Sequence, residues 1–195
     1  MKVAQLSGSL RTNVGKKDAK AVRNAGQVPC VLYGLGKQTH FSVKDITMQK
    51  LIINPDVFQI ELDVDGVKSR AIVQEIQQNP ITDKIVHVDF LELNDKKAVT
   101  IALPVRLIGS SRGVLAGGKL LQVYRKLKVT ALPGELPEAI IIDIAKIRIG
   151  QSIRVGDLET TGLKFSDAKS AVVVSVKMAR GASKAAEELD EEEED

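Results

Sequence analysis

Residues 11–34, RTNVGKKDAKAVRNAGQVPCVLYG, predict a short cationic helix that leads directly into an apolar strand. The stretch holds five cations against one acid. If residues 16–25 are helical, Lys16, Lys20 and Arg23 follow the spacing i, i+4 and i+7 and therefore share one face. A cationic helix held on a β-scaffold is suited to binding phosphate groups.

The C-terminal end of this predicted helix is marked by two residues. Gly26 suits the C-terminal end of a helix, and Pro29 prevents the helix from continuing. Ala21, Val22 and Ala25 are expected to form a small apolar face behind the cations. This face would pack the helix against the strand that follows it.

Composition predicts a protein of two domains with an aliphatic core. The chain has 195 residues and 44% hydrophobic residues, but only 3% aromatic residues and no Trp. No apolar run approaches the roughly 18 residues of a membrane span, and the N-terminal segment lacks the apolar region of a secretory signal. A single cysteine excludes an internal disulfide and suits the reducing cytoplasm.

Charge is distributed unevenly along the chain. The formal charge is +3 overall, but residues 187–195 carry eight acids and no base, so residues 1–186 carry +11. Residues 1–37 alone hold seven bases and one acid. A basic body with an acidic tail indicates either a protein that binds polyanions or a well-solvated surface.

The first part of the chain predicts an α+β domain over residues 1–93. Its strands are expected at residues 3–10, 28–35, 40–43, 58–64, 67–76 and 85–93, and a second helix near residues 46–53. The strand pattern at 58–64 alternates apolar and polar residues, and Asp65-Gly66 is a strong hairpin signal.

A polar joint at residues 94–97 marks the predicted boundary to a mainly β domain over residues 94–180. Its strands are expected at residues 99–108, 120–131, 139–144 and 171–178, which are rich in β-branched residues. The last segment, residues 181–195, is expected to be an acidic disordered tail.

His87 and Asp89 form the most distinctive polar pair in the sequence. They lie two residues apart in IVHVDF, so on a strand they share one face, while Val86, Val88 and Phe90 share the other. The pair could recognise a ligand, could be inert on the surface, or could act as a catalytic dyad. No local serine completes a catalytic triad.

Enzymatic and metal-binding sites have weak support. Cys30 could be a nucleophile with His87 as its base, but its apolar surroundings favour a buried structural thiol. Residues 113–119, GVLAGGK, match most of a phosphate-binding loop, yet Leu120 stands where a hydroxyl is needed, so a glycine-rich turn is favoured. With His40 as the only other histidine, no spacing predicts a zinc site or any cofactor.

Several motifs together carry a family resemblance. They are A-x-x-x-R-x-x-G-x-V-P followed by VLYG at 19–34, V-Q-x-x-Q-x-x-P and HVDF within 73–90, RGVLAGGKL at 112–120, LPGELPEAIIIDI at 132–144 and IRIGQSIRVGDL at 147–158. In these motifs the chain resembles the bacterial large-subunit ribosomal protein L-twenty-five family in its long form, also called the general stress protein CTC family. The resemblance covers nearly all of residues 1–180.

The resemblance implies a non-enzymatic protein of the large ribosomal subunit, in the cytoplasm. It implies an N-terminal β-barrel-like domain that binds 5S rRNA at an internal loop with non-Watson–Crick pairs, and a C-terminal β-domain as an appendage. Implied partners are 5S rRNA and neighbouring ribosomal proteins, with no membrane, small-molecule substrate or cofactor. The family's RNA-contact positions that match this sequence are Arg11, Lys16, Lys20, Arg23, Tyr33, Gln74, His87 and Asp89.

These positions divide into two expected roles. Lys16, Lys20 and Arg23 would hold phosphates. The residues expected to fit the shape and edges of an irregular RNA minor groove are Tyr33, Gln74, His87 and Asp89. The chain departs from the family at Lys20, where an Arg is common, and at Ala19, where a Ser can occur. The alternatives are a stress-induced RNA-binding protein acting off the ribosome, and a thiol- or nucleotide-dependent enzyme.

Overall fold

The chain is divided into two compact units in a computed structural model that describes residues 2–34, 36–54, 56–158 and 162–178. The first unit comprises the chain up to Val99 together with Leu132–Glu138, and the second comprises Thr100–Ala131 together with the chain from Ala139 onward. The predicted acidic tail at 181–195 lies outside the described residues.

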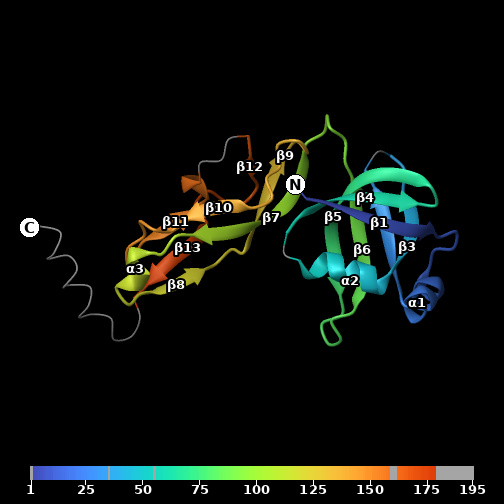
Figure 1. The fold of residues 1–195 in the computed structure, drawn as a ribbon, viewed down its shortest axis with the longest axis horizontal. Helices are drawn as coiled ribbons and strands as arrows, with labels where there is room; N and C mark the ends of the chain where they lie inside the picture. The colour runs from blue at the N-terminus through green and yellow to red at the C-terminus, as the bar shows by residue number, and fades with distance from the viewer. Residues whose placement is uncertain (1, 35, 55, 159–161, 179–195) are drawn as a thin grey trace, which may run out of the picture. The chain divides into compact units, whose positions relative to one another are not determined.

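Six strands of the first unit form a closed barrel in the order β1-β3-β2-β6-β5-β4 (Figure 1). Two parallel pairings between strands distant in sequence, β1 with β4 and β2 with β6, close it. Apart from small shifts at their ends, the strands coincide with those predicted. They are β1 (Lys2–Leu10), β2 (Gln27–Tyr33), β3 (Thr39–Lys44), β4 (Phe58–Val64), β5 (Val67–Gln78) and β6 (Ile85–Glu92).

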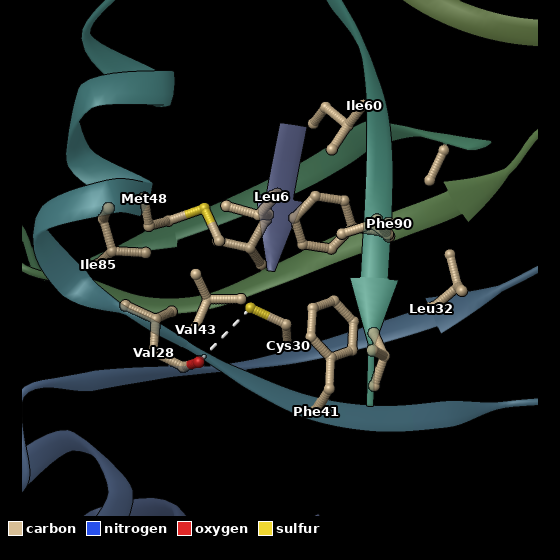
Figure 2. Packing of buried hydrophobic residues seen from close by; sticks show 14 residues of the cluster. Leu6, Val28, Cys30, Leu32, Phe41, Val43, Met48, Ile60, Ile85 and Phe90 are labelled. Atoms are coloured by element: carbon tan, nitrogen blue, oxygen red, sulfur yellow. Dashed lines mark hydrogen bonds between the residues drawn. The ribbon is translucent and has the colours of Figure 1, made fainter. Parts of the chain in front are cut away.

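The interior of the barrel is filled by aliphatic side chains around two aromatic rings (Figure 2). Phe41 and Phe90 stack in a tilted arrangement with ring centroids 5.5 Å apart. Met48 reaches this core from a helix and is fully buried. Cys30 is also fully buried, and its Sγ donates a hydrogen bond to the carbonyl of Val28 at 3.5 Å. The thiol is therefore part of the core, as the apolar sequence around it predicts.

Two short helices interrupt the strand order of the barrel. α1 (Lys16–Asn24) lies between β1 and β2, and α2 (Asp45–Ile53) lies between β3 and β4. Both lie toward the lower end of the barrel in Figure 1, as does the turn between β5 and β6. Gly26 follows α1 with φ +75°, the left-handed conformation that lets the chain turn into β2.

The second unit is mainly β, as predicted. Its strands form a four-stranded sheet, β10-β7-β9-β12, and a three-stranded sheet, β11-β13-β8. The elements are β7 (Val99–Ile108), α3 (Arg112–Leu115), β8 (Lys119–Gln122), β9 (Lys126–Ala131), β10 (Ile140–Asp143), β11 (Ser152–Arg154), a 3₁₀ turn (Val155–Asp157), β12 (Lys164–Phe165) and β13 (Val172–Lys177).

One predicted strand of this unit is wrong. The expected strand over residues 120–131 is two strands, β8 and β9, which belong to different sheets. The chain changes sheets at residues 123–125, where the backbone amides of Val123 and Tyr124 both point to the carbonyl of Val173. The sequence does not reveal this break, because both strands contribute apolar side chains to a buried core and the whole stretch therefore looks like one strand.

The glycine-rich segment near α3 is a tightly closed turn. The amide of Gly118 donates to the carbonyl of Gly113 at 2.8 Å, and the amide of Gly117 donates to Val114 at 3.0 Å. A Cβ atom on Gly118 would lie only 2.6 Å from the Gly113 carbonyl oxygen. These amides are used within the turn and do not form a cradle for a phosphate group, in agreement with the structural interpretation of this motif.

Candidate nucleic-acid interface

The polar residues singled out in the sequence come together on the outer face of β2, β6 and β5. β6 lies between the other two, with Val31 of β2 and Glu75 of β5 both paired with Asp89. Tyr33 lies two residues further along β2. These three neighbouring strands therefore place a phenol, an imidazole and two carboxylates on one side of the barrel.

His87 and Asp89 form a close pair at the centre of this face. The distance between His87 Nδ1 and Asp89 Oδ1 is 2.6 Å, and the two side chains are 29% and 26% exposed. Val88 and Phe90, which alternate with them, are fully buried in the barrel. The predicted shared face is confirmed. With Nδ1 directed at the carboxylate, Nε2 is the imidazole nitrogen left for another partner.

Two β-bulges between β5 and β6 shape the same face, and neither was predicted. Register shifts lie between Val73 and Glu75 on β5 and beside the pair of Gln77 with His87. The first leaves Gln74 as the extra residue of β5. At the second, the pairing moves from His87 directly to Ile85, so Val86 is the extra residue of β6.

The second bulge corrects the predicted core face of β6. Val86 is only half-buried, whereas Ile85 is 4% exposed and belongs to the barrel core. The simple alternation of a regular strand would have placed Val86 inside. Because Val86 is the extra residue of the bulge, its carbonyl oxygen is available to accept a hydrogen bond from Arg23 of α1.

Tyr33 remains a neutral phenol beside these carboxylates. Partial burial, together with the negative charges of Asp89 and Glu75, raises the pKa of Tyr33 above its ordinary value. A phenol that keeps its proton can donate a hydrogen bond as well as stack. Tyr33 is thus a donor at a site that is otherwise rich in acceptors.

Glu75 is the member of this face that sequence reasoning missed. It is exposed and stands directly across from Asp89. Like charges directly opposite on adjacent strands are destabilising, and no Lys or Arg within the described ranges forms an ion pair with Glu75. That Glu75 lies opposite Asp89 could have been found only from the register of β5 against β6, and the bulge at Gln74 changes that register.

The cations of α1 differ in their surroundings. Lys16 and Lys20 are exposed, as expected. Arg23 is half-buried, and its Nη1 donates to the carbonyl oxygen of Val86 at 3.2 Å. The expectation that Arg23 lies on a cationic face, with Val22 on an apolar face behind it, is therefore wrong, since both side chains are half-buried.

The predicted apolar face of α1 also needs correction. Ala21 and Ala25 are exposed, and the half-buried apolar residues are Ala19 and Val22. The helix is rotated so that Arg23, rather than the small alanines, reaches β6. The cationic spacing identified the helix correctly but did not determine which side of it docks.

Arg11 is held in an ion pair within the protein. Its guanidinium donates to Asp18 Oδ2 from Nη2 at 2.5 Å and from Nε at 3.2 Å, and its side chain is only 9% exposed. The Arg11 amide donates to the carbonyl of His40 at 2.9 Å. Arg11 therefore connects the end of β1 to both α1 and β3.

A hollow of about 380 Å³ lies where α1 ends, beside the start of α2 and the turn between β5 and β6. Arg23 and Lys84 give it cationic groups, and Val28 and Ile85 give it apolar ones. Its full lining comprises Arg23, Asn24, Gly26, Gln27, Val28, Asp45, Asn79, Thr82, Lys84, Ile85 and Val86.

The structure separates the residues of the enzymatic alternative. Cys30 points into the barrel core, where burial raises the pKa of its thiol well above the ordinary range. His87 is on the outer face, so it is not placed to act as a base for Cys30. Over the part of the chain that the structure describes, no three His, Cys, Asp or Glu residues are grouped to hold a metal ion. None of the helices described there is long and apolar enough to cross a membrane.

Comparison with known proteins gives matches over both units. Residues 6–90 match the Ribosomal L25p family, and residues 98–180 match the family described as Ribosomal protein TL5, C-terminal domain.

Among curated proteins, a large ribosomal subunit protein bL25 from Porphyromonas gingivalis is 47% identical over 188 residues, which is 95% of this chain and 98% of that protein. The proteins of the same name from Phocaeicola vulgatus and Bacteroides thetaiotaomicron are 41% and 39% identical, each over 95% of this chain, and over 98% and 97% of their own lengths.

Proposed function

Because the chain belongs to the ribosomal L25p family, in a form that also carries a TL5 C-terminal domain, we propose that it binds 5S ribosomal RNA through the outer face of its barrel. Family membership makes the protein a structural, non-enzymatic component of the large ribosomal subunit in the cytoplasm. The RNA partner and the contact residues are the proposed part.

The observation that carries this proposal is the hydrogen bond from Arg23 to the Val86 carbonyl. It fixes the cationic helix α1 beside the strand residue that immediately precedes His87. Cations suited to phosphate binding and groups able to recognise RNA edges are thereby placed on neighbouring elements. Affinity from phosphate contacts and specificity from base or sugar contacts are the two elements that RNA recognition needs.

The exposed lysines of α1 would bind phosphates. Lys16 and Lys20 lie one helical turn apart, and both are free to extend toward an RNA backbone. Arg23 donates one Nη1 bond within the protein and retains Nη2 and Nε as further donors. RNA contact by Arg11 stays a prediction, and the RNA would have to share or replace the ion pair with Asp18.

The sheet face would recognise the edges of an irregular RNA groove. Asp89 is an anion and would repel phosphate, so its role must be to accept hydrogen bonds from base amino groups or a 2′-hydroxyl. His87 offers Nε2, Tyr33 offers a phenolic donor, and Gln74 offers an amide on a bulge. These groups are suited to an internal loop with non-Watson–Crick pairs more than to a regular duplex.

A hydroxyl-radical footprint of the full chain on isolated 5S RNA tests this proposal. We expect protection confined to an internal loop, lost when Lys16 and Lys20 are both changed to Ala and altered when Asp89 is changed to Asn. Binding to large subunits with no protection anywhere on 5S RNA would contradict the proposal while leaving the ribosomal role in place.

A further inference from the structure

Most of the net positive charge of residues 1–178 lies in the second unit, not in the unit that carries the proposed 5S site. Residues 1–99 and 132–138 hold 14 Lys and Arg against 13 Asp and Glu, a net charge of +1. Residues 100–131 and 139–178 hold 12 against four, a net charge of +8. A compact unit with this imbalance attracts polyanions in its own right.

The imbalance is greatest in the segment that forms the centre of the four-stranded sheet. Residues 100–131 contain six Lys and Arg and no acid. This segment includes nearly all of β7 and the whole of β9, which are adjacent in the sheet. The hydrogen bond from the Val105 amide to the Arg125 carbonyl, at 2.9 Å, lies where β7 meets the residue that precedes β9.

Three lysines of β9 and β12 are exposed on this sheet. Along β9, Lys126 and Lys128 are exposed, whereas the alternating Leu127 and Val129 are fully buried. The two lysines lie about 7 Å apart along the strand. Lys164 of β12 is also exposed and pairs with Thr130, which continues the same side of β9. We refer to Lys126, Lys128 and Lys164 as the lysine face.

Hydroxyl groups lie among these lysines. Thr130 Oγ1 is 2.7 Å from Thr100 Oγ1 and 3.4 Å from Ser166 Oγ, so the three hydroxyls form a row across β7, β9 and the end of β12. The acid nearest to the row in sequence, Asp167, accepts a hydrogen bond from the backbone amide of Lys128 at 2.8 Å. Its carboxylate is thus engaged with the main chain. Lysines interspersed with hydroxyls are typical donors to phosphate and sugar oxygens.

We propose that the lysine face of the second unit binds the phosphate backbone of ribosomal RNA, as a contact separate from the barrel site. The inference rests on the ribosomal setting of the chain but not on the identity of the RNA bound by the barrel. Charge complementarity selects RNA as the partner, since the face presents cations and hydroxyls where a protein interface would present an apolar centre. The contact is expected to add affinity without reading sequence.

The test compares two full-length variants that lose the same charge from the same unit. The face variant is Lys126→Gln, Lys128→Gln and Lys164→Gln. The control variant is Lys119→Gln, Lys146→Gln and Lys177→Gln, all exposed, with Lys119 and Lys177 paired across the other sheet. The measurement is the affinity for large subunits stripped of this protein, over a range of KCl concentrations, together with the affinity for isolated 5S RNA.

We expect the face variant to bind stripped subunits roughly tenfold or more weakly at low salt than the control variant. Its log–log salt slope should be shallower by about 2, from roughly 0.7 to 0.9 for each of three phosphate contacts. Its affinity for isolated 5S RNA should equal that of the control. Equal subunit affinities and slopes for the two variants would overturn the proposal, and so would weaker binding with an unchanged slope, which would indicate a protein partner.

A second measurement needs no variant. Amine acetylation of the unaltered protein, free and bound to subunits, should show protection of Lys126, Lys128 and Lys164 on binding, while Lys119 and Lys177 keep their reactivity. Full reactivity of the lysine face on the subunit would also overturn the inference. Failure of the 5S proposal would be seen separately, as a wild-type protein that binds stripped subunits but not isolated 5S RNA.

Discussion

The Nδ1 atom of His87 lies 2.6 Å from Oδ1 of Asp89 on the outer face of β6, while Val88 between them is fully buried. The pair is therefore oriented by a strand whose position is fixed by the barrel core. Neither side chain can turn away without breaking this contact. An acceptor and an imidazole that hold each other in place on a fixed strand are suited to discriminating between RNA shapes.

Asp89→Asn is expected to reduce the discrimination between the cognate 5S loop and a regular RNA duplex. The change keeps the size of the side chain but replaces one acceptor oxygen with a donor. Asp89→Lys should raise duplex binding and lose specificity, because it adds attraction to phosphate. The measurement is the ratio of the two dissociation constants at one fixed salt concentration.

Glu61→Gln provides the matched control for this prediction. Glu61 is an exposed carboxylate on β4, a strand not adjacent to β6, and it accepts a weak hydrogen bond from Gln5 at 3.3 Å. Its variant should leave the ratio unchanged. If the Asp89 variants also leave it unchanged, Asp89 is not part of the site.

Lys20→Ala and Arg23→Ala should both weaken 5S binding but differ in their effect on folding. Lys20 is exposed, so its loss should leave the urea midpoint of unfolding unchanged. Arg23→Ala removes the hydrogen bond to Val86 and should lower the free energy of unfolding by about 1 kcal/mol. Equal urea midpoints for the two variants would show that the bond to β6 contributes nothing to stability.

The ion pair between Arg11 and Asp18 should stabilise the junction of β1 and α1. Because the Arg11 side chain is only 9% exposed, a double-mutant cycle with Arg11→Ala and Asp18→Ala should give a coupling free energy of about 1 kcal/mol, measured by urea unfolding. Asp18→Ala should also free Arg11 for RNA and leave 5S affinity at least as high as in the wild type. A coupling near zero would show that the pair is incidental.

Binding to 5S RNA should weaken steeply with salt. A log–log slope of about −2 to −4 is expected, from roughly three to five phosphate contacts at 0.7 to 0.9 each. The Lys16→Ala and Lys20→Ala double variant should make the slope shallower by about 1.5. A slope near zero in the wild type would contradict phosphate binding by α1.

The buried thiol of Cys30 should make the protein less stable in alkali. Below the ordinary thiol pKa of about 8.5, the thiol is protonated in both the folded and the unfolded state. Its protonation then costs the folded state no free energy of unfolding. Above that pKa the unfolded chain releases the proton while the folded chain keeps it, since burial raises the Cys30 pKa, so stability falls with rising pH. In Cys30→Ala this part of the fall, at most about 1.4 kcal/mol per pH unit, should disappear. Urea midpoints from pH 7 to pH 10 provide the measurement, and parallel curves for the two proteins would contradict it.

The features that follow from local pattern were predicted well. The strands of the barrel and the position of α1 depend on apolar alternation, cation spacing and the Gly26 and Pro29 signals, which are all local in the sequence. The shared face of His87 and Asp89 follows from the alternation of a single strand. These are properties that one segment carries by itself.

The features that depend on pairing between distant segments could not be read from the sequence. A bulge such as that at Gln74 exists only in relation to the opposite strand, and so does the position of Glu75 across from Asp89. The rotation that half-buries Arg23 depends on the acceptor offered by Val86, 63 residues away. The ion pair of Arg11 had one signal in the sequence. Asp18 is the only acid in residues 11–34, so it was the only nearby carboxylate that could pair with Arg11.

The parallel pairing of β2 with β6 also determines the order in which the barrel can form during synthesis of the chain. α1 and β2 are synthesised well before β6, the strand with which β2 pairs. In the same way, β1 cannot form its parallel pairing until β4 has been synthesised. Until β6, the last strand of the barrel, is inserted, β2 and β5 each have an unpaired edge, and the proposed RNA-binding face lacks its middle strand. Such non-local closure is slow compared with helix formation. Under the proposed function, an emerging chain would present the cations of α1 before the complete sheet face, so RNA bound before closure would be held only by weak, salt-sensitive phosphate contacts.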